Sequence, residues 1–177
     1  MMAYCEISTP VGPLRLVGDD EGLREIAFLG GKRPPVSMPA GPPSREPFRD
    51  VIAELDEYFA GRLMRFHARL APRGTPFQLR VWSLLREIPY GETTTYAGIA
   101  RTLGQPNACR AVGAANGRNP IPVIIPCHRV VGADGSLTGF GGGLDIKRAL
   151  LRLEAGGRDR FLPLPDPLLP FGDVPEG

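Results

Sequence analysis

The chain has 177 residues, of which 42% are hydrophobic and 23% are charged, as in globular proteins that fold around their own core. The longest apolar runs fall well short of the ~18 residues that a membrane-spanning helix needs, which excludes an integral membrane protein of that kind. The N-terminal residues lack the basic and then apolar order of a secretory signal, so a cytoplasmic location is expected.

The net charge of +2 is unevenly distributed along the chain. Residues 1–72 carry −1, residues 73–158 carry +6 and residues 159–177 carry −3. A basic excess confined to one segment is expected where that segment meets a polyanion such as DNA. Many small domains are also modestly basic without binding nucleic acid, so charge alone leaves both readings open.

The chain has three cysteines, Cys5, Cys109 and Cys127, and two histidines, His67 and His128. An odd, small number of cysteines argues against a disulfide framework, and the absence of a Cys-x-x-Cys pair argues against a structural zinc site. Cys5 and His67 could share a metal only with further ligands that the sequence does not offer. No metal and no other cofactor is expected.

Three short strands are predicted at the start of the chain, over Tyr4–Ser8, Leu14–Gly18 and Leu23–Leu29, separated by turn sequences. A proline-rich loop over 30–47 precedes a helix whose apolar side chains recur at helical spacing up to Gly61. Residues 1–72 are therefore predicted to form a small α/β domain of antiparallel strands covered by a helix. Nothing in this domain suggests chemistry.

Three helices are predicted next. Thr75 and Gln78 form a capping-box pattern around Pro76 at the start of the first, which ends before Pro89. Two shorter helices, over 96–103 and 107–116, flank a turn over 104–106, and this is a helix-turn-helix pattern. The pattern alone is weak, because many helix pairs share it.

The segment after these helices is predicted to carry the reactive groups. The apolar run 123–125 reads as a buried strand that ends at Cys127 and His128, followed by a glycine-rich loop over 132–143. A last helix is predicted from Asp145 to about Glu154. Residues 159–177 form a proline-rich tail, for which disorder is expected.

Cys127 is the candidate nucleophile. Glu154, on the inward face of the last helix, could orient His128, which could in turn activate the thiol. Because adjacent residues of an extended chain point to opposite sides, a water is expected to bridge His128 and Cys127. The alternative is a buried structural cysteine beside a capping histidine, and for an arbitrary Cys-His pair that reading is the commoner one.

The run Pro126–Val130 resembles the active-site signature of the O6-alkylguanine-DNA alkyltransferases. The resemblance extends in unbroken order through the second half of the chain, over Gly74–Gln78, Ile88–Thr93, Arg110–Gly113, Asn119-Pro120, Leu137–Phe140, Gly142–Leu144, Lys147 and Glu154. It implies an α/β two-domain fold, with a small antiparallel sheet and helix over 1–72 and a helical, winged-helix-like domain with a helix-turn-helix over 73–158.

The resemblance also implies a function: irreversible, stoichiometric transfer of the alkyl group from O6-alkylguanine in double-stranded DNA to Cys127. The lesion must leave the duplex, since a thiol cannot reach a stacked base. The product is a thioether, which water does not hydrolyse, so one protein molecule repairs one lesion. A monomer is expected. The sequence leaves open the preferred alkyl group and any activity on O4-alkylthymine.

The family's residue roles carry over to matching positions. Cys127 would accept the alkyl group, and His128 and Glu154 would activate the Cys127 thiol through water. Asn119 would shape the turn that links the recognition helix to the active site, and Lys147 would support the site. The residues expected to contact the base or the DNA are Tyr96 (at N3 of the flipped guanine), Arg110 (inserted in its place), Gln105, the carbonyls of Cys127 and Val130, and the pocket wall at Phe140 and Gly141.

Two positions depart from the family pattern: Gly141 replaces a serine of some relatives, so only its backbone N–H could contact O6, and Cys109 stands where alanine is common. Arg129 is expected to be a buried structural partner. Three competing readings remain: a cysteine hydrolase, which would need an oxyanion hole; a DNA-binding relative without transfer activity, which would lack the acceptor cysteine; and a transcription regulator.

Overall fold

The computed structural model describes residues 1–31 and 39–156. Three strands, β1 (Ala3–Thr9), β2 (Gly12–Asp19) and β3 (Gly22–Phe28), form an antiparallel sheet in the order β1-β2-β3, which confirms the predicted meander. Alternate side chains of β1 (Ala3, Cys5 and Ile7) are buried, because successive residues of a strand face opposite sides. The sheet therefore presents one apolar face to the rest of the molecule.

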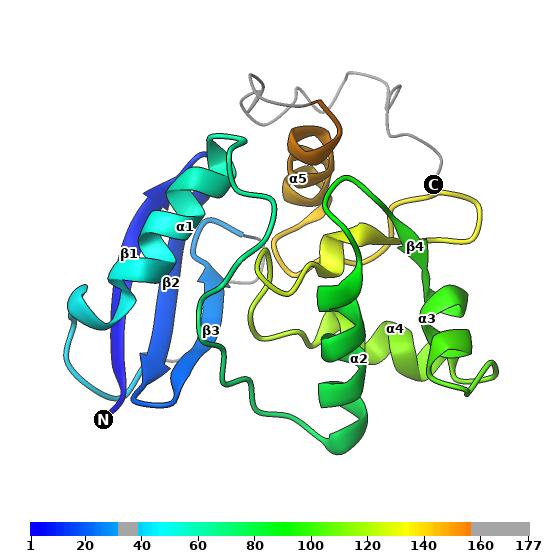
Figure 1. Cartoon of the computed structure of the whole chain (residues 1–177), viewed down its shortest axis with the longest axis horizontal. Coiled ribbons are helices and arrows are strands. Elements are labelled where there is room, and N and C mark those ends of the chain that lie inside the picture. Colours follow the sequence, from blue (N-terminus) through cyan, green and yellow to red (C-terminus); the bar gives the residue numbers. More distant parts are fainter. Residues whose placement is uncertain (32–38, 157–177) are drawn as a thin grey trace.

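Helix α1 (Arg49–Phe59), preceded by a 3₁₀ turn over Glu46–Phe48, covers that face of the sheet (Figure 1). The buried side chains that α1 contributes are Val51, Leu55, Tyr58 and Phe59. The ring of Tyr58 is fully buried and contacts three further aromatic rings, those of Phe59, Phe66 and Tyr90. The first 72 residues thus contain the small α/β unit that the sequence predicts.

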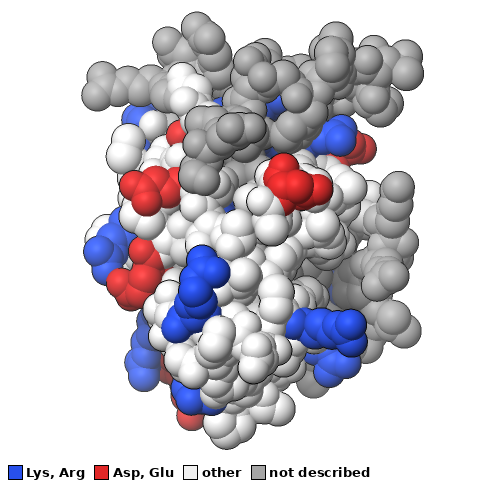
Figure 2. All heavy atoms as spheres, turned by 90° about the vertical axis from the view of Figure 1, so that its right-hand side faces the viewer, with Lys and Arg blue, Asp and Glu red and all other residues white. Residues whose placement is uncertain are grey.

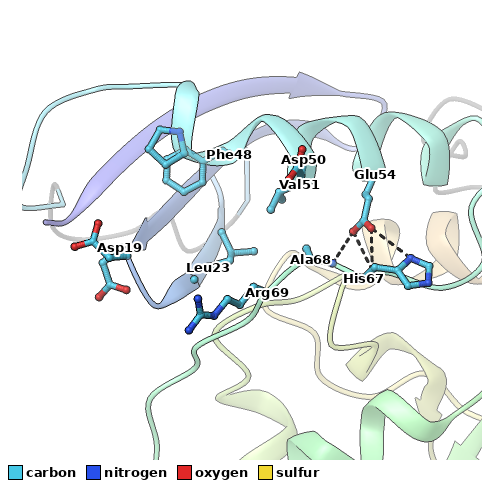
Figure 3. A pocket seen from close by; sticks show the side chains of 12 residues that line it. Asp19, Leu23, Phe48, Asp50, Val51, Glu54, His67, Ala68 and Arg69 are labelled. Atoms are coloured by element: carbon cyan, nitrogen blue, oxygen red, sulfur yellow. Dashed lines mark hydrogen bonds and ion pairs between the residues drawn. The ribbon is translucent and has the colours of Figure 1, made fainter.

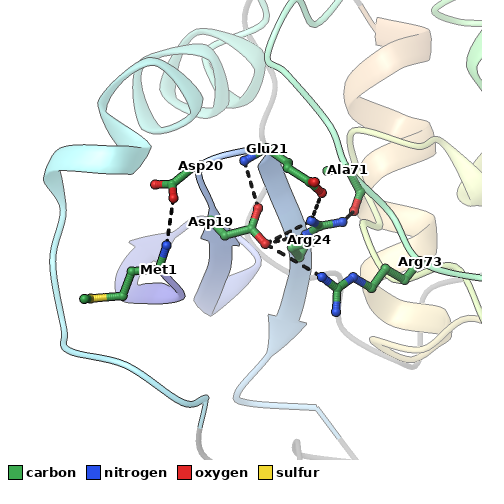
Figure 4. A network of polar contacts seen from close by, with 7 residues as sticks. All are labelled: Met1, Asp19, Asp20, Glu21, Arg24, Ala71 and Arg73. Carbon is green, nitrogen blue, oxygen red and sulfur yellow. Dashed lines mark hydrogen bonds and ion pairs between the residues drawn. The ribbon is translucent and has the colours of Figure 1, made fainter.

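The segment that leads from α1 to the second half runs along the edge of the sheet. The backbone N–H of Leu23 donates to the carbonyl of Arg69 (2.9 Å), and that of Ala71 donates to the carbonyl of Leu23 (2.8 Å). Figure 4 shows the polar network beside these bonds, in which Arg24 donates to Asp19 (2.9 Å) and to the carbonyl of Ala71 (2.7 Å). The connection is therefore fixed to β3.

Three helices dominate the second half: α2 (Pro76–Glu87), α3 (Tyr96–Thr102) and α4 (Cys109–Gly117). The predicted capping box opens α2, with both hydrogen bonds between Thr75 and Gln78 present. The indole of Trp82 donates to the carbonyl of Ala115 (2.9 Å) and ties α2 to α4. Helices α3 and α4 form the helix-turn-helix, as predicted (Figure 1).

The predicted strand over 123–125 is wrong. These residues lie in a compact turn, closed by a bond from the N–H of Ile125 to the carbonyl of Ile121 (2.9 Å), and Val123 has a φ of 74°. A short apolar run is equally compatible with a buried strand and a buried turn, and the side chain of Asn119 supplies the hydrogen bonds that a sheet would have supplied. Buried, left-handed backbone at a β-branched residue is strained, typically by about 1–3 kcal/mol.

Two short strands were not predicted: β4 (Thr94–Thr95) pairs in parallel with β5 (Val130–Val131). They join the start of α3 to the segment that follows Cys127. The last helix, α5 (Leu144–Gly156), follows the glycine-rich loop as predicted. No helix among the described residues has the length and apolarity to cross a membrane. The expectation of a disordered tail lies outside the described residues.

Candidate active site

Cys127 and His128 lie in a 3₁₀ turn, Cys127–Arg129, directly after the compact turn over 121–125. Both are buried, with Cys127 only 5% exposed and His128 fully enclosed. The sequence predicts that the two side chains point to opposite sides of an extended chain. This prediction is wrong, because the backbone here forms a 3₁₀ turn and is not extended. The turn presents a buried thiol next to a buried imidazole.

Glu154, on α5, is the centre of the buried polar cluster. Its Oε1 is 2.7 Å from His128 Nε2 and accepts from Arg129 (2.9 Å) and from the Tyr58 hydroxyl (2.7 Å), while its Oε2 accepts from Arg129 Nε (2.8 Å). Burial alone would raise the pKa of Glu154, but the charges and hydrogen bonds of His128 and Arg129 hold it well below its ordinary value. Glu154 is therefore an ionised carboxylate that orients His128.

The contact with Glu154 leaves the other imidazole nitrogen of His128 for a different partner. Nδ1 is buried and has no hydrogen-bond partner among the described residues. With Nε2–H donating to the carboxylate, Nδ1 is an acceptor in the neutral ring. The sequence-predicted link between Glu154 and His128 is thus present, and Nδ1 is the atom that a water could join to the thiol.

Asn119 and Lys147 reach the thiol from two other segments. Asn119 donates to the carbonyl of Ile125 (2.7 Å) and accepts from the N–H of Ile121 (3.0 Å), which holds the compact turn in shape. Burial raises the pKa of the Cys127 thiol to about 11, while a hydrogen bond from Asn119 and the charge of Lys147 act in the opposite direction. In the resting protein Cys127 is therefore a protonated thiol.

Lys147 is itself fully buried, and its ammonium donates to the carbonyls of Val130 (2.7 Å) and Thr138 (2.8 Å). Burial lowers the pKa of Lys147 to about 8, although the nearby Cys127 raises it. The two hydrogen bonds connect the segment after the thiol to the glycine-rich loop. Lys147 thus both fixes the loop and provides positive charge next to Cys127.

The glycine-rich loop also contacts α3 and the N-terminal sheet. The hydroxyls of Tyr96 and Thr138 are 2.8 Å apart, and the rings of Phe140 and Phe28 lie 5.6 Å apart. Gly141 lines a small pocket that it shares with Asn119 and with residues of β3. The loop therefore lies between α3 and β3, next to the segment that carries Cys127.

The predicted site residues fall into two groups. One is brought together around the thiol: Cys127, His128, Glu154, Asn119, Lys147, Val130 and, through the loop, Tyr96, Phe140 and Gly141. The second group consists of Gln105 and Arg110, which are exposed on the helix-turn-helix. Arg129 is buried and paired with Glu154, in agreement with its predicted structural role.

The sequence reasoning missed Tyr58, which donates to Glu154 from α1 in the first half of the chain. The helical pattern placed Tyr58 correctly on an apolar face. A buried tyrosine hydroxyl requires a hydrogen-bond partner, and this requirement was the available signal for a polar contact across the core.

A separate pocket on the first half of the chain is lined by Glu54 and His67 (Figure 3). The Glu54 carboxylate accepts from the backbone N–H groups of His67 (2.9 Å) and Ala68 (3.0 Å). Cys5 lines a different pocket, and no group of three metal-binding side chains occurs within residues 1–31 and 39–156. Glu54 thus fixes the backbone after α1.

We expect the three thiols of the folded protein to differ sharply in reactivity. Cys109 is exposed, whereas Cys5 and Cys127 are buried and burial raises the pKa of both. A disulfide reagent such as DTNB at pH 8 should therefore modify one thiol rapidly, and Cys109→Ala should remove that fast phase. Two fast thiols in the folded wild-type protein would show that Cys5 or Cys127 is more accessible than the structure indicates.

A buried thiol, on the residue before a histidine that pairs with a buried glutamate, occurs in the same chain as a helix-turn-helix with an exposed arginine. This combination defines a class of protein that joins cysteine chemistry to nucleic-acid binding. Two family models match the chain: the ribonuclease-like domain of 6-O-methylguanine DNA methyltransferase over residues 2–72 and the DNA-binding domain of the same family over 76–156. The chain belongs to the 6-O-methylguanine DNA methyltransferase family.

Relatives along nearly the whole chain support this membership. The methylated-DNA–protein-cysteine methyltransferase of Methanosarcina acetivorans is 52% identical over 153 residues, which cover 86% of this chain and 98% of the relative. The protein of the same description from Mycobacterium tuberculosis is 49% identical over 154 residues, covering 87% and 93%.

Solved structures agree with the two-part α/β fold. Mycobacterium tuberculosis OGT in complex with DNA superposes with a TM-score of 0.84 at 47% identity, covering 92% of this chain and 98% of that one. The O6-methylguanine-DNA methyltransferase of Pyrococcus kodakaraensis superposes with a TM-score of 0.61 at 28% identity, covering 87% and 99%. The predicted fold class is confirmed.

Proposed function

We propose that this protein repairs DNA by transferring the alkyl group of O6-alkylguanine to Cys127, once per protein molecule. The observation that carries the proposal is the buried thiol next to a histidine that Glu154 orients at 2.7 Å, within a chain of this methyltransferase family. The substrate is double-stranded DNA. The reaction consumes the protein, because water does not hydrolyse the thioether product and the thiol is not regenerated.

The proposed step begins with a protonated thiol. A water between Cys127 Sγ and His128 Nδ1 passes the thiol proton to the imidazole, and the ionised Glu154 stabilises the imidazolium that forms. The thiolate attacks the alkyl carbon, the bond from that carbon to O6 breaks, and guanine leaves with the electron pair. A proton donor near the base then neutralises the guanine anion.

Tyr96 is proposed as the donor that faces N3 of the flipped guanine. Its hydroxyl lies 2.8 Å from that of Thr138 and is therefore already directed toward the loop that walls the site. The carbonyl of Val130 accepts from Lys147, and its second lone pair remains for the exocyclic amine of guanine. The carbonyl of Cys127 would accept from the same amine, and Phe140 and Gly141 would line the base pocket.

The DNA is proposed to contact the face that carries α3 and α4. Figure 2 shows that side of the molecule, where basic side chains, with acidic ones among them, are spread over a largely uncharged surface. Arg110 and Gln105 are exposed there, at the start of α4 and in the turn before it. Few, separated charges suit a protein that binds phosphates without a strong sequence preference.

The proposal includes a cytoplasmic monomer. A single chain holds the whole cluster around Cys127, so no second copy is needed to complete it. The acceptor must be a reduced thiol, and a reducing compartment such as the cytoplasm keeps thiols in that state.

Arg110 is proposed to help extrude the base by entering the duplex in its place. Arg110→Ala should therefore slow repair of duplex DNA by about 10-fold or more but leave the reaction with the free base O6-benzylguanine nearly unchanged, provided that the pocket admits this base. Arg80→Ala, which removes the same charge from α2, is the matched control. Equal slowing of both substrates by Arg110→Ala would assign Arg110 to the integrity of the site instead.

Titration of protein against a fixed amount of O6-methylguanine duplex tests the function as a whole. The repaired lesions should equal the protein added and should not increase with time after completion. Continued repair by the same protein molecules would indicate a hydrolytic mechanism, as in a cysteine hydrolase, and would contradict the proposal.

A further inference from the structure

The carboxylate that orients His128 is bound from both halves of the chain. Tyr58, on α1, donates its hydroxyl proton to Glu154 Oε1 at 2.7 Å, the distance at which His128 Nε2 contacts the same oxygen. The two residues are 96 positions apart in the sequence. Both the Tyr58 and Glu154 side chains are buried, so water does not compete for this bond.

We propose that Tyr58 is a positioning residue for alkyl transfer, and that its hydroxyl sets how strongly Glu154 holds the proton of His128. This inference rests on the function proposed above and extends it, because it assigns part of the reaction machinery to the first half of the chain. The bond joins α1 to the residue on which the general base depends.

The charged and titratable groups around Glu154 define what the Tyr58 bond can do. His128 and Arg129 face the carboxylate from the 3₁₀ turn, Tyr58 faces it from α1, and Tyr90 lies near it after α2. Arg129 also donates to the carbonyl of Ile88 (2.7 Å), which fixes its position. Arg129 and Tyr58 are therefore the two donors that compete with His128 for Oε1.

The competing donors differ in charge. Burial, and then the charge of Glu154, raise the pKa of Tyr58 well above its ordinary value, so the hydroxyl remains a neutral donor over the working range of pH. A hydrogen bond from a neutral donor spreads the negative charge of Oε1 and weakens its attraction for an imidazolium. The Tyr58 bond therefore limits how strongly Oε1 can stabilise a protonated His128.

Removing the hydroxyl should therefore shift the proton equilibrium of His128 in one direction. In Tyr58→Phe the full charge of Oε1 is shared between Arg129 and His128 alone, so the imidazolium is favoured and the His128 titration midpoint moves to higher pH. Alkyl transfer should become about 10-fold slower on the acid side of neutrality, because less neutral His128 is present, and should approach the wild-type rate at higher pH.

The chain offers a matched control. Tyr90 contacts the ring of Tyr58 edge-on, with centroids 6.2 Å apart, but its hydroxyl is directed at the carbonyl of Leu153 (3.4 Å). Tyr90→Phe thus removes a neighbouring tyrosine hydroxyl without removing a donor to Glu154. A purely structural role of Tyr58 would predict similar behaviour of the two variants.

The deciding experiment is an NMR titration of the 177-residue chain labelled at histidine, which gives signals from His67 and His128 only. We expect the midpoint of the buried His128 to rise in Tyr58→Phe and to stay unchanged in Tyr90→Phe, with the exposed His67 unaffected in both. Thermal unfolding of each variant would verify that it is folded. An unchanged His128 midpoint in folded Tyr58→Phe overturns the inference.

The pH dependence of transfer to DNA, measured on the same variants, provides the second readout. The acid limb should move to higher pH for Tyr58→Phe alone. If the wild-type protein transferred no alkyl group at all, the proposed function would fail, while the NMR titration would still decide whether Tyr58 tunes His128. The two failures are thus distinguishable.

Discussion

Cys127→Ser should abolish alkyl transfer and leave binding to O6-methylguanine duplex almost unchanged. The Cys127 side chain is only 5% exposed, so exchanging sulfur for oxygen alters little of the exposed surface that would bind DNA. The serine hydroxyl has no accessible anionic form here, and oxygen is a much weaker nucleophile toward an alkyl carbon than a thiolate.

Transfer should be measured as loss of the methyl group from the oligonucleotide, and binding as the salt-dependent Kd of the same duplex. Cys109→Ser is the matched control, because it makes the same exchange at the exposed cysteine next to Arg110. We expect Cys109→Ser to retain transfer. Residual stoichiometric transfer in Cys127→Ser, with the methyl group found on Cys109, would show that the acceptor has been assigned to the wrong cysteine.

Glu154→Gln should lower both activity and stability. The substitution keeps the shape of the side chain but leaves the buried Arg129 guanidinium without its counter-ion, and breaking a buried pair in this way typically costs about 3–5 kcal/mol. It also removes the charge that stabilises the His128 imidazolium, so transfer should fall by about 100-fold or more. Denaturant unfolding and single-turnover rates measure the two effects.

The stability effect has a defined pH dependence. The pKa of Glu154 is held below its ordinary value of 4.5 in the folded protein, so its ionisation stabilises the fold above that pH and ceases to do so as the pH falls. The difference in unfolding free energy between the wild type and Glu154→Gln should therefore narrow below about pH 4.5. Glu57→Gln, which breaks the exposed pair with Arg62, should change little. A constant difference from pH 7 to pH 3 would contradict the ionised state of Glu154.

Local sequence signals sufficed for much of the fold. The turn sequences that separate β1, β2 and β3 and the capping box at Thr75 and Gln78 depend only on near neighbours, and both are present in the structure. The pairing of His128 with Glu154 was also predictable, because α5 has a clear inward face. By contrast, the turn over 121–125 depends on hydrogen bonds of the Asn119 side chain, and no local sequence pattern predicts these bonds.

The contribution of the first half of the chain to the site could not be predicted in the same way. Tyr58 is one of several apolar positions on α1, and periodicity shows only that it is buried. Its partner Glu154 belongs to an element at the far end of the chain, and nothing in either helix specifies that α1 and α5 meet. Tertiary packing decides such contacts, as it does for the pairing of β4 with β5.

Mass spectrometry of the protein after reaction with excess O6-methylguanine duplex is the most direct test of transfer to Cys127. Each protein molecule should gain one methyl group, about 14 Da, located on the peptide that contains Cys127, and longer incubation should add no more. A protein that leaves the lesion repaired but its own mass unchanged, or a methyl group on any other residue, would contradict irreversible transfer to Cys127.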